Sequence, residues 1–427
     1  MLRAEETREA LETIARGESG RVLASLIATF GDFDLAEDAL QEALAAALER
    51  WPQEGVPRRP AAWLTVAARR RALDRLRHRA VQAEKTEALQ QGEALRQDEL
   101  ASVEGDEVMP DERLRLLFTC CHPALSAEAR VALTLRMLGG LSTEAVARAF
   151  LLPVPTLAKR LDRAKKKIRA ARIPYRVPPE SEWAERLGSV LAVVYLVFNE
   201  GYSATDVEPH VRRALCAEAI RLARVLKDLL PGESEVHALL ALTLLHDARR
   251  DARFDADGSL VPLDEQDRAR WRAAELGEGL AALRDAAACR GRGAYQVQAA
   301  IAAAHVLAPT GADTRWPTIA RLYAELETLV PTPVVRVNRA VAEGRAHGAA
   351  AGLALLDALA GDETRRRLAD YLPYHAARAD LLRGAGCADE ACAAYHSALA
   401  LCRSEPERRF LSARLAGLPG SRRVGRL

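Results

Sequence analysis

Residues 140–172 read GLSTEAVARAFLLPVPTLAKRLDRAKKKIRAAR, the pattern of two short helices joined by a tight turn. Ser142 can cap the first helix, because its hydroxyl can accept from an amide one turn further on. The chain then breaks at residues 151–154, and Pro155 restarts it where a missing N–H costs nothing. Apolar residues of the second helix recur every three or four positions, which predicts one packed face: Val154, Leu157, Leu161, Ala164 and Ile168. The stretch therefore predicts a helix-turn-helix.

The other faces of the second helix carry a strong positive charge. Its basic residues are Lys159, Arg160, Arg163, Lys165, Lys166, Lys167, Arg169 and Arg172, opposed only by Asp162. A recognition helix needs one face packed on its partner and another free to meet phosphates and base edges in the major groove. An ordinary amphipathic hairpin with a solvated basic face has a similar composition. The tight break and the one-sided charge favour DNA binding.

Composition indicates a helical protein of several domains. The chain has 427 residues, of which 49% are hydrophobic and only 5% aromatic, with a net charge of +2. This length suggests about two to four domains, and the abundance of Ala, Leu and Arg predicts an all-α fold. No apolar run approaches a membrane span, and seven cysteines without a secretion signal fit a reducing compartment. We therefore expect a cytoplasmic protein that does not enter a membrane.

Four segments follow one another along the chain. Residues 1–80 and 111–173 are expected to form two small helical units. Between them, residues 81–110 hold eight acidic residues against Lys85 and Arg96, which predicts a flexible acidic linker. Residues 174–427 are expected to form an extension of short amphipathic helices.

The extension has helical segments of the size found in tetratricopeptide (TPR) arrays. The predicted helices are Tyr295–Leu307, Trp316–Leu329, Val334–Glu343, Tyr371–Arg383 and Asp389–Arg403. Small residues at regular helix positions would let neighbouring helices approach closely, as repeat packing requires. An irregular helical domain without true repeats remains the alternative.

The first unit carries a compact acidic patch after residue 33. Asp34 and Glu37 are placed to form a reciprocal helix cap. A buried stripe is expected at Leu40, Leu44, Ala47, Leu48 and Trp51. Another face holds Glu37, Asp38, Gln41 and Glu42, and the like charges of Asp38 and Glu42 repel at i,i+4 spacing. Such a patch suggests a basic protein partner, although solubility charge near a helix N-terminus explains it equally well.

The next helix, from residue 61, is rich in arginine. Its expected inward residues are Trp63, Val66, Ala67, Leu73 and Leu76. Its other faces carry Arg69, Arg70, Arg71, Arg75, Arg77 and Arg79, with Asp74 as the lone acid. The guanidinium group suits phosphate well, so the helix is predicted to contact DNA, with a solvated basic face as the alternative.

The order of these parts resembles sigma factors of bacterial RNA polymerase, in particular the extracytoplasmic-function group built from the domains called region 2 and region 4. AEDALQEAL (Ala36–Leu44) looks like the region 2 helix that docks on the polymerase clamp. AAWLTVAARRRALDRLRHR (Ala61–Arg79) looks like the segment that melts and reads the −10 element, and Gly140–Arg169 looks like region 4. FTCCHP (Phe118–Pro123), IPYRVP (Ile173–Pro178) and FNEGY (Phe198–Tyr202) are similar to a subgroup with a C-terminal TPR-like extension.

The resemblance implies a role for each charged surface. Polymerase-binding residues would be Asp34, Glu37, Asp38, Gln41 and Glu42. Residues at the −10 element would be Trp63, Arg69, Arg70, Arg71, Asp74 and Arg75. In the −35 major groove would lie Thr156, Lys159, Arg160 and Arg163, with Lys166, Lys167 and Arg169 on phosphates. Many relatives have a Gly in the turn where Leu151, Leu152 and Pro153 stand here, which leaves the base preference open.

The implied partners are the clamp and flap of core RNA polymerase, promoter DNA, and a protein or ligand for the extension. No cofactor, metal or catalytic residue is expected. Adjacent positions in Cys120-Cys121-His122 point in different directions, so buried cysteines are favoured over zinc. Residues 255–259 resemble a calcium loop, but Gln266 stands where a bidentate Glu is required, so a turn is favoured. Two other functions stay open: a one-component DNA-binding regulator with a TPR-like sensor, and a TPR-type scaffold.

Overall fold

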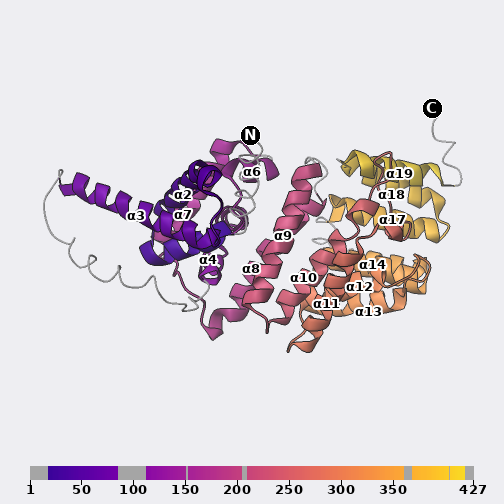
Figure 1. Cartoon of the computed structure of the whole chain (residues 1–427). Helices are drawn as coiled ribbons and strands as arrows, with labels where there is room; N and C mark the ends of the chain where they lie inside the picture. Colours follow the sequence, from indigo (N-terminus) through magenta and orange to yellow (C-terminus); the bar gives the residue numbers. More distant parts are fainter. Residues whose placement is uncertain are drawn as a thin grey trace. The chain divides into compact units, whose positions relative to one another are not determined.

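The computed structural model describes residues 18–84, 112–150, 152–203, 209–359, 368–402 and 404–418. The chain divides into two compact units, Met1–Val197 and Phe198–Leu427 (Figure 1). Helices make up both units, and the described residues contain no strand beyond an isolated bridge between Phe254 and Leu260. The predicted all-α fold is confirmed.

The first unit holds the two small helical groups predicted from the sequence. Helices of the first group are residues 18–30, α2 (Phe33–Glu54) and α3 (Pro60–Glu84). Those of the second group are α4 (Arg113–Cys120), α5 (Ala127–Met137), α6 (Thr143–Ala149) and α7 (Val154–Ala170), followed by α8 (Glu180–Ser203). The α2 and α3 helices pack along each other, with Trp51 and Trp63 in an edge-to-face contact of 5.5 Å between ring centroids. The predicted linker falls mainly on residues 85–110, which lie outside the described residues.

The cap of α2 differs from the prediction. Asp32 is the capping residue, and its Oδ1 accepts from the amides of Asp34 at 2.9 Å and Leu35 at 3.1 Å. The predicted reciprocal cap of Asp34 and Glu37 is therefore wrong. Because the helix begins at Phe33, both acids lie inside its first two turns, and their carboxylates do not cap it.

The packed faces of α2 and α3 agree only in part with the predicted stripes. On α2, Leu40, Ala47 and Trp51 are buried as predicted, but Leu48 is 48% exposed. On α3, Val66 is 57% and Leu76 39% exposed, so their predicted inward positions are wrong. The buried face of α3 consists instead of Leu64, Ala68 and Ala72. Small residues at i,i+4 spacing let α2 and α3 approach closely. The larger side chains of Val66 and Leu76 therefore lie on other faces of α3.

The helix-turn-helix forms as predicted. The Ser142 hydroxyl accepts from the amide of Ala145 at 3.1 Å, and Pro155 lies in the first turn of α7. Leu157, Leu161, Ala164 and Ile168 are buried. Val154 is 38% exposed, because it begins the helix ahead of the turns that pack on α5 and α6. The packed stripe leaves the rest of the α7 surface available.

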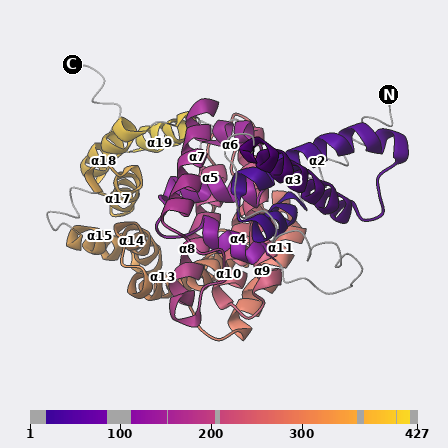
Figure 2. The same ribbon diagram turned by 90° about the vertical axis from the view of Figure 1, so that its left-hand side faces the viewer.

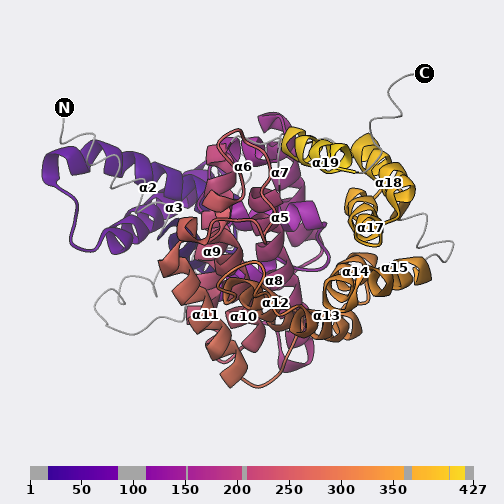
Figure 3. The same ribbon diagram turned by 90° about the vertical axis from the view of Figure 1, so that its right-hand side faces the viewer.

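The second unit is a succession of adjacent helices (Figures 2 and 3). After α9 (Pro209–Leu229) and α10 (Ser234–Asp247) come the short helices η1 (Arg250–Ala252) and η2 (Arg268–Arg270). Then follow α11 (Ala273–Ala288), α12 (Ala294–Val306), α13 (Trp316–Leu329), α14 (Pro333–His347), α15 (Ala349–Ala358), α17 (Leu372–Gly384), α18 (Ala388–Leu401) and α19 (Glu405–Ala416). The five helices predicted here are confirmed, with ends shifted by a few residues.

Small residues allow close helix packing in this unit, as predicted. A Cβ on Gly352 of α15 would lie 2.5 Å from the carbonyl oxygen of Ala340 in α14. Only glycine permits that approach of the two backbones. Tyr395 of α18 is buried in a cluster with Ala379, Leu382 and Ala391, and its hydroxyl donates to Asp380 at 2.6 Å.

Candidate polymerase and nucleic-acid interfaces

The basic face of α7 is largely open to solvent. Arg160 is half-buried, whereas the following predicted DNA contacts are exposed: Thr156, Lys159, Arg163, Lys166, Lys167 and Arg169. Lys166 pairs with Asp162 at 2.9 Å, within the same helix and with both side chains exposed. An exposed i,i+4 pair of this kind is weak and exchanges readily for a phosphate. The helix therefore presents a cationic surface whose opposite side is fixed by the apolar stripe.

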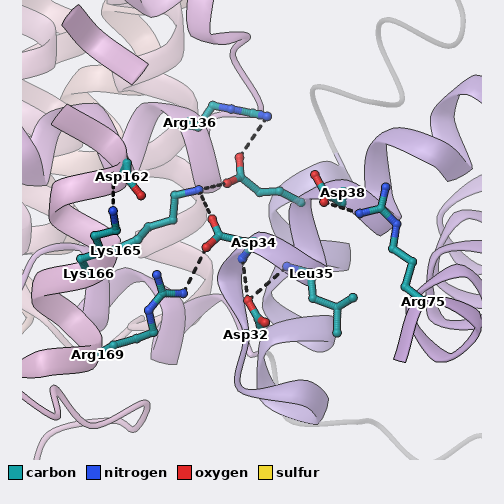
Figure 4. A network of polar contacts seen from close by, with 11 residues as sticks. Asp32, Asp34, Leu35, Asp38, Arg75, Arg136, Asp162, Lys165, Lys166 and Arg169 are labelled. Atoms are coloured by element: carbon teal, nitrogen blue, oxygen red, sulfur yellow. Dashed lines mark hydrogen bonds and ion pairs between the residues drawn. The ribbon is translucent and has the colours of Figure 1, made fainter. Parts of the chain in front are cut away.

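Lys165 faces the acidic patch of α2 (Figure 4). Its Nζ lies 2.6 Å from Asp34 Oδ1 and 2.6 Å from Glu37 Oε2, and the side chain is only 12% exposed. Arg136 of α5 holds the other oxygen of Glu37 at 3.0 Å. Arg169 of α7 reaches Asp34 Oδ2 at 3.1 Å. Two predicted polymerase-binding acids are thus paired with cations of the helix-turn-helix group.

The charges of this network stabilise one another. Burial alone would raise the pKa of Asp34, but hydrogen bonds from Lys165 and Arg169 outweigh it and lower that pKa. Burial alone would lower the pKa of Lys165, yet the charge of Glu37 and the contact with Asp34 raise it. Asp34 and Lys165 are therefore ionised at neutral pH, and their attraction acts in a partly desolvated setting.

Arg75 of α3 binds the other two acids of the patch. Its Nε donates to Glu42 Oε1 at 2.9 Å, and its Nη1 pairs with Asp38 Oδ2. The hydrogen bond to Glu42 raises the pKa of Arg75 further. A predicted −10 contact and two predicted polymerase contacts therefore meet in one exposed cluster. In the absence of other partners these side chains satisfy one another.

The remaining predicted residues of α2 and α3 surround that cluster. Trp63 is half-buried against Trp51, whereas Gln41 and Arg70 are exposed and Arg69 is half-buried. Arg71 Nε lies 3.9 Å from Glu42, and Asp74 pairs with Arg77 at 3.3 Å. The arginines thus form an open basic surface along α3, next to the acidic face of α2.

Sequence reasoning missed three residues of this region. Lys165 and Arg136 contact the acidic patch, and Asp32 caps the helix that carries it. Lys165 lies beside Ala164 and Ile168 of the apolar stripe, so its position next to a packed face was a signal for partial burial. Nothing local in the sequence marked Arg136, because its partner is about a hundred residues away in the chain.

Other polar sites of the chain have structural roles. Cys120 and Cys121 are buried as predicted, and burial raises the pKa of the Cys121 thiol to about 11. The Asp255 carboxylate accepts from the amides of Asp257 and Ser259 at 3.0 and 2.8 Å, which confirms the predicted turn. Among the residues that the structure describes, no cluster of three His, Cys, Asp or Glu side chains could hold a metal ion. No described helix is long and apolar enough to cross a membrane.

The FNEGY segment both ends a helix and lines a cavity. Residues 198–202 lie in the last turns of α8, where Gly201 and Tyr202 border a cavity of about 100 Å³. The Arg253 guanidinium lies 3.8 Å above the Tyr202 ring, and Nη1 donates to the Tyr202 carbonyl at 2.6 Å. These contacts fix the end of α8 within the second unit.

Comparison with known families assigns three segments of the chain. The family model described as sigma-70 region 2 matches residues 18–81, and that of sigma-70 region 4 matches residues 115–168. A family of unknown function (DUF6596) matches residues 186–287. An uncharacterized protein of Rhizobium meliloti (strain 1021) is 42% identical over 400 residues, which cover 92% of each chain. No solved structure matches the chain.

Proposed function

Because this chain belongs to the sigma-70 family, as a factor of the extracytoplasmic-function type with a C-terminal helical extension, we propose residue-level roles for its charged surfaces. As a sigma factor, it associates with core RNA polymerase and directs promoter-specific initiation of transcription. Sigma factors act by binding rather than by catalysis. This conclusion rests on one observation. The family models of sigma-70 region 2 and region 4 match the first and the second helical group of the first unit, in that order.

The exposed face of α7 enters the major groove of the −35 element. Thr156, Lys159, Arg160 and Arg163 lie in its first three turns and meet base edges, because a recognition helix enters the groove by its N-terminal end. Lys166, Lys167 and Arg169 follow in its last turns and contact phosphates. The flap of core polymerase is the protein partner of this domain.

The arginine-rich face of α3 engages the opened −10 element. Arg69, Arg70, Arg71 and Arg75 neutralise the single strand, and Trp63 offers an aromatic surface for an unpaired base. Asp74 is an acceptor for base amino groups in the same region. An arginine face on a region 2 helix favours a sigma factor over a one-component regulator or a scaffold, since neither of these melts DNA.

The acidic face of α2 binds the clamp of core polymerase. Asp34, Glu37, Asp38, Gln41 and Glu42 form it, and the charges suit a basic protein surface. Core polymerase is cytoplasmic, so the complex forms there. The helical extension modulates this activity through a protein or ligand partner, and its hairpins supply the surface for that partner.

Reconstitution with core RNA polymerase tests these roles. We expect the full chain to direct initiation from its own promoters in place of the housekeeping factor. Asp38→Asn combined with Glu42→Gln should weaken binding to core polymerase by about tenfold while leaving the binding of free DNA unchanged. Both residues are solvent-accessible and their partner is Arg75, so the fold should survive the change.

Glu49→Gln is the matched control, because Glu49 is exposed near the other end of α2. It should leave the affinity for core polymerase unchanged. Absence of promoter-specific transcripts with the unmodified chain would contradict the function, whereas an unchanged affinity of the double variant would contradict the assignment of the clamp surface alone.

A further inference from the structure

We propose that the first unit is an autoinhibited state, in which region 4 occupies the face of α2 that core RNA polymerase must bind. The inference rests on the proposed clamp-binding role of that face. Region 2 here means residues 18–84 and region 4 means residues 112–173. Cations of region 4 stand where a basic surface of the polymerase would otherwise lie.

The first argument is the saturation of Glu37. One carboxylate oxygen binds Lys165 and the other binds Arg136, and the side chain is 12% exposed. Each oxygen of this carboxylate thus already has a cationic partner, and the side chain is largely shielded from solvent. The polymerase can reach Glu37 only after Lys165 and Arg136 have left it. The closed state and the core-bound state therefore exclude each other at this residue.

A second argument is that backbone packing accompanies the charge pairs. Gly20, in the helix of residues 18–30, lies against Leu138 at the end of α5, and a Cβ on Gly20 would come within 2.8 Å of the Leu138 carbonyl oxygen. The Tyr175 hydroxyl, directly after region 4, donates to the Ala24 carbonyl at 2.9 Å. The backbones of the two regions therefore approach each other closely at these two points, in addition to the pairing of surface charges.

The third argument concerns what the closed state leaves open. Lys159, Arg163 and Lys167 of α7 are exposed, and the cations of α7 that pair with the described residues of region 2 are Lys165 and Arg169 instead. Region 4 uses Lys165 and Arg169 for the closed contact, and these lie on the flank next to the apolar stripe. The closure therefore blocks the polymerase-binding face while most of the DNA-binding face stays accessible.

A zero-length carbodiimide cross-linker detects the closed state directly. It joins an amine to a carboxylate only when they touch, and Lys165 Nζ lies 2.6 Å from both Asp34 and Glu37. We expect mass spectrometry of the full chain to find a cross-link from Lys165 to one of these acids. When core RNA polymerase is bound before the cross-linker is added, this cross-link should not form. Persistence of the cross-link in the isolated complex with core polymerase would overturn the proposal.

Two variants should open the closed state by independent routes. Lys165→Ala removes the central cation, and Gly20→Ala introduces a Cβ that the Leu138 carbonyl cannot accommodate. Loss of one member of a partly buried ion pair is strongly unfavourable, and a clash of a Cβ with a backbone oxygen also destabilises the closed contact. Each variant should therefore raise the affinity for core polymerase by about tenfold or more. Arg176→Ala is the control, because Arg176 is exposed next to Tyr175 and should leave that affinity unchanged.

The outcomes separate this proposal from the function itself. If Lys165→Ala supports promoter-specific transcription but binds core polymerase no more tightly than the unmodified chain, the autoinhibition is wrong and the sigma factor function stands. If neither the unmodified chain nor Lys165→Ala supports promoter-specific transcription, the proposed sigma factor function is wrong. Circular dichroism shows whether Gly20→Ala folds, and Lys165→Ala decides the question if it does not.

Discussion

His246 of α10 should make the second unit labile at mildly acidic pH. Its Nδ1 accepts from Arg249 Nη2 at 2.9 Å, and its ring lies 5.4 Å from the Tyr202 ring. Burial, together with the charges of Arg249 and Arg253, lowers the pKa of His246 from 6.5 to about 3. Protonation of Nδ1 would replace a hydrogen bond with the repulsion of two cations.

The size of the effect follows from linkage. A base whose folded pKa is depressed loses its stabilising contribution as the pH falls below the unfolded pKa. With values of 6.5 and about 3, this loss is about 2 kcal/mol at pH 5. Burial lowers the pKa of His305 to about 4, which adds a loss of about 2 kcal/mol at the same pH.

Asp247 works in the opposite direction. Burial raises its pKa from 3.8 to about 6, so its protonation stabilises the folded unit by about 1.4 kcal/mol at pH 5. The three groups together predict a net loss of about 3 kcal/mol of unfolding free energy between pH 8 and pH 5. Such a loss is a large part of the stability of an ordinary domain.

This loss can be measured by unfolding the full chain, labelled with 5-fluorotryptophan, in urea. Fluorine NMR then monitors the unfolding at each tryptophan. Trp271 and Trp316 report on the second unit, and the other three of the five tryptophans report on the first. His246→Gln keeps an acceptor for Arg249 but cannot titrate, so it should remove about 2 kcal/mol of the pH dependence. His347→Gln is the control, since His347 is 56% exposed.

Equal unfolding free energies at pH 5 and pH 8 for the unmodified chain would refute the reasoning. So would a His246→Gln variant that keeps the full pH dependence, because the lost stability would then come from other groups. A pH dependence confined to the signals of the first unit would be equally contradictory.

Two further predictions concern α7. Leu161→Ala should lower the unfolding free energy of the first unit by about 2–5 kcal/mol, because the side chain is only 6% exposed within the packed stripe. The signal of Trp183, whose ring lies 5.4 Å from that of Phe118 in α4, measures it, and a loss below about 1 kcal/mol would mean that the site is loosely packed. Lys167→Ala should weaken promoter binding equally for all sequences and reduce the slope of log affinity against log salt by about 1. An unchanged slope in titrations at several salt concentrations would remove Lys167 from the phosphate contacts.

Much of the secondary structure of this chain could be predicted because helices depend on local patterns. The spacing of Leu157, Leu161 and Ile168 identified the packed face of α7, and the Ser142 cap required only neighbouring residues. The predicted stripe of α3 was less accurate. Leu64, Ala68 and Ala72 pack there instead of Val66, since the choice between two apolar faces depends on how closely α2 can approach.

The candidate site was also predictable only in part. The positions of the acidic, arginine-rich and basic helices follow from the sequence, and their order resembles the sigma-70 pattern that the comparisons confirm. Which charges pair with which could not be predicted. Lys165 and Glu37 are 128 residues apart, and no local rule relates residues at that separation.

The sequence by itself determined that this protein is all-helical, because periodicity, capping and composition act over a few residues. The sigma factor family was indicated by the resemblance of its motifs and their order. Only the tertiary structure decided that Lys165 and Arg169 turn toward the acidic patch while Lys159 and Lys167 face solvent. The physical reason is that a charge on a helix surface acquires its partner only when helices pack. The free energy of that contact depends on burial and distance, which no linear pattern records.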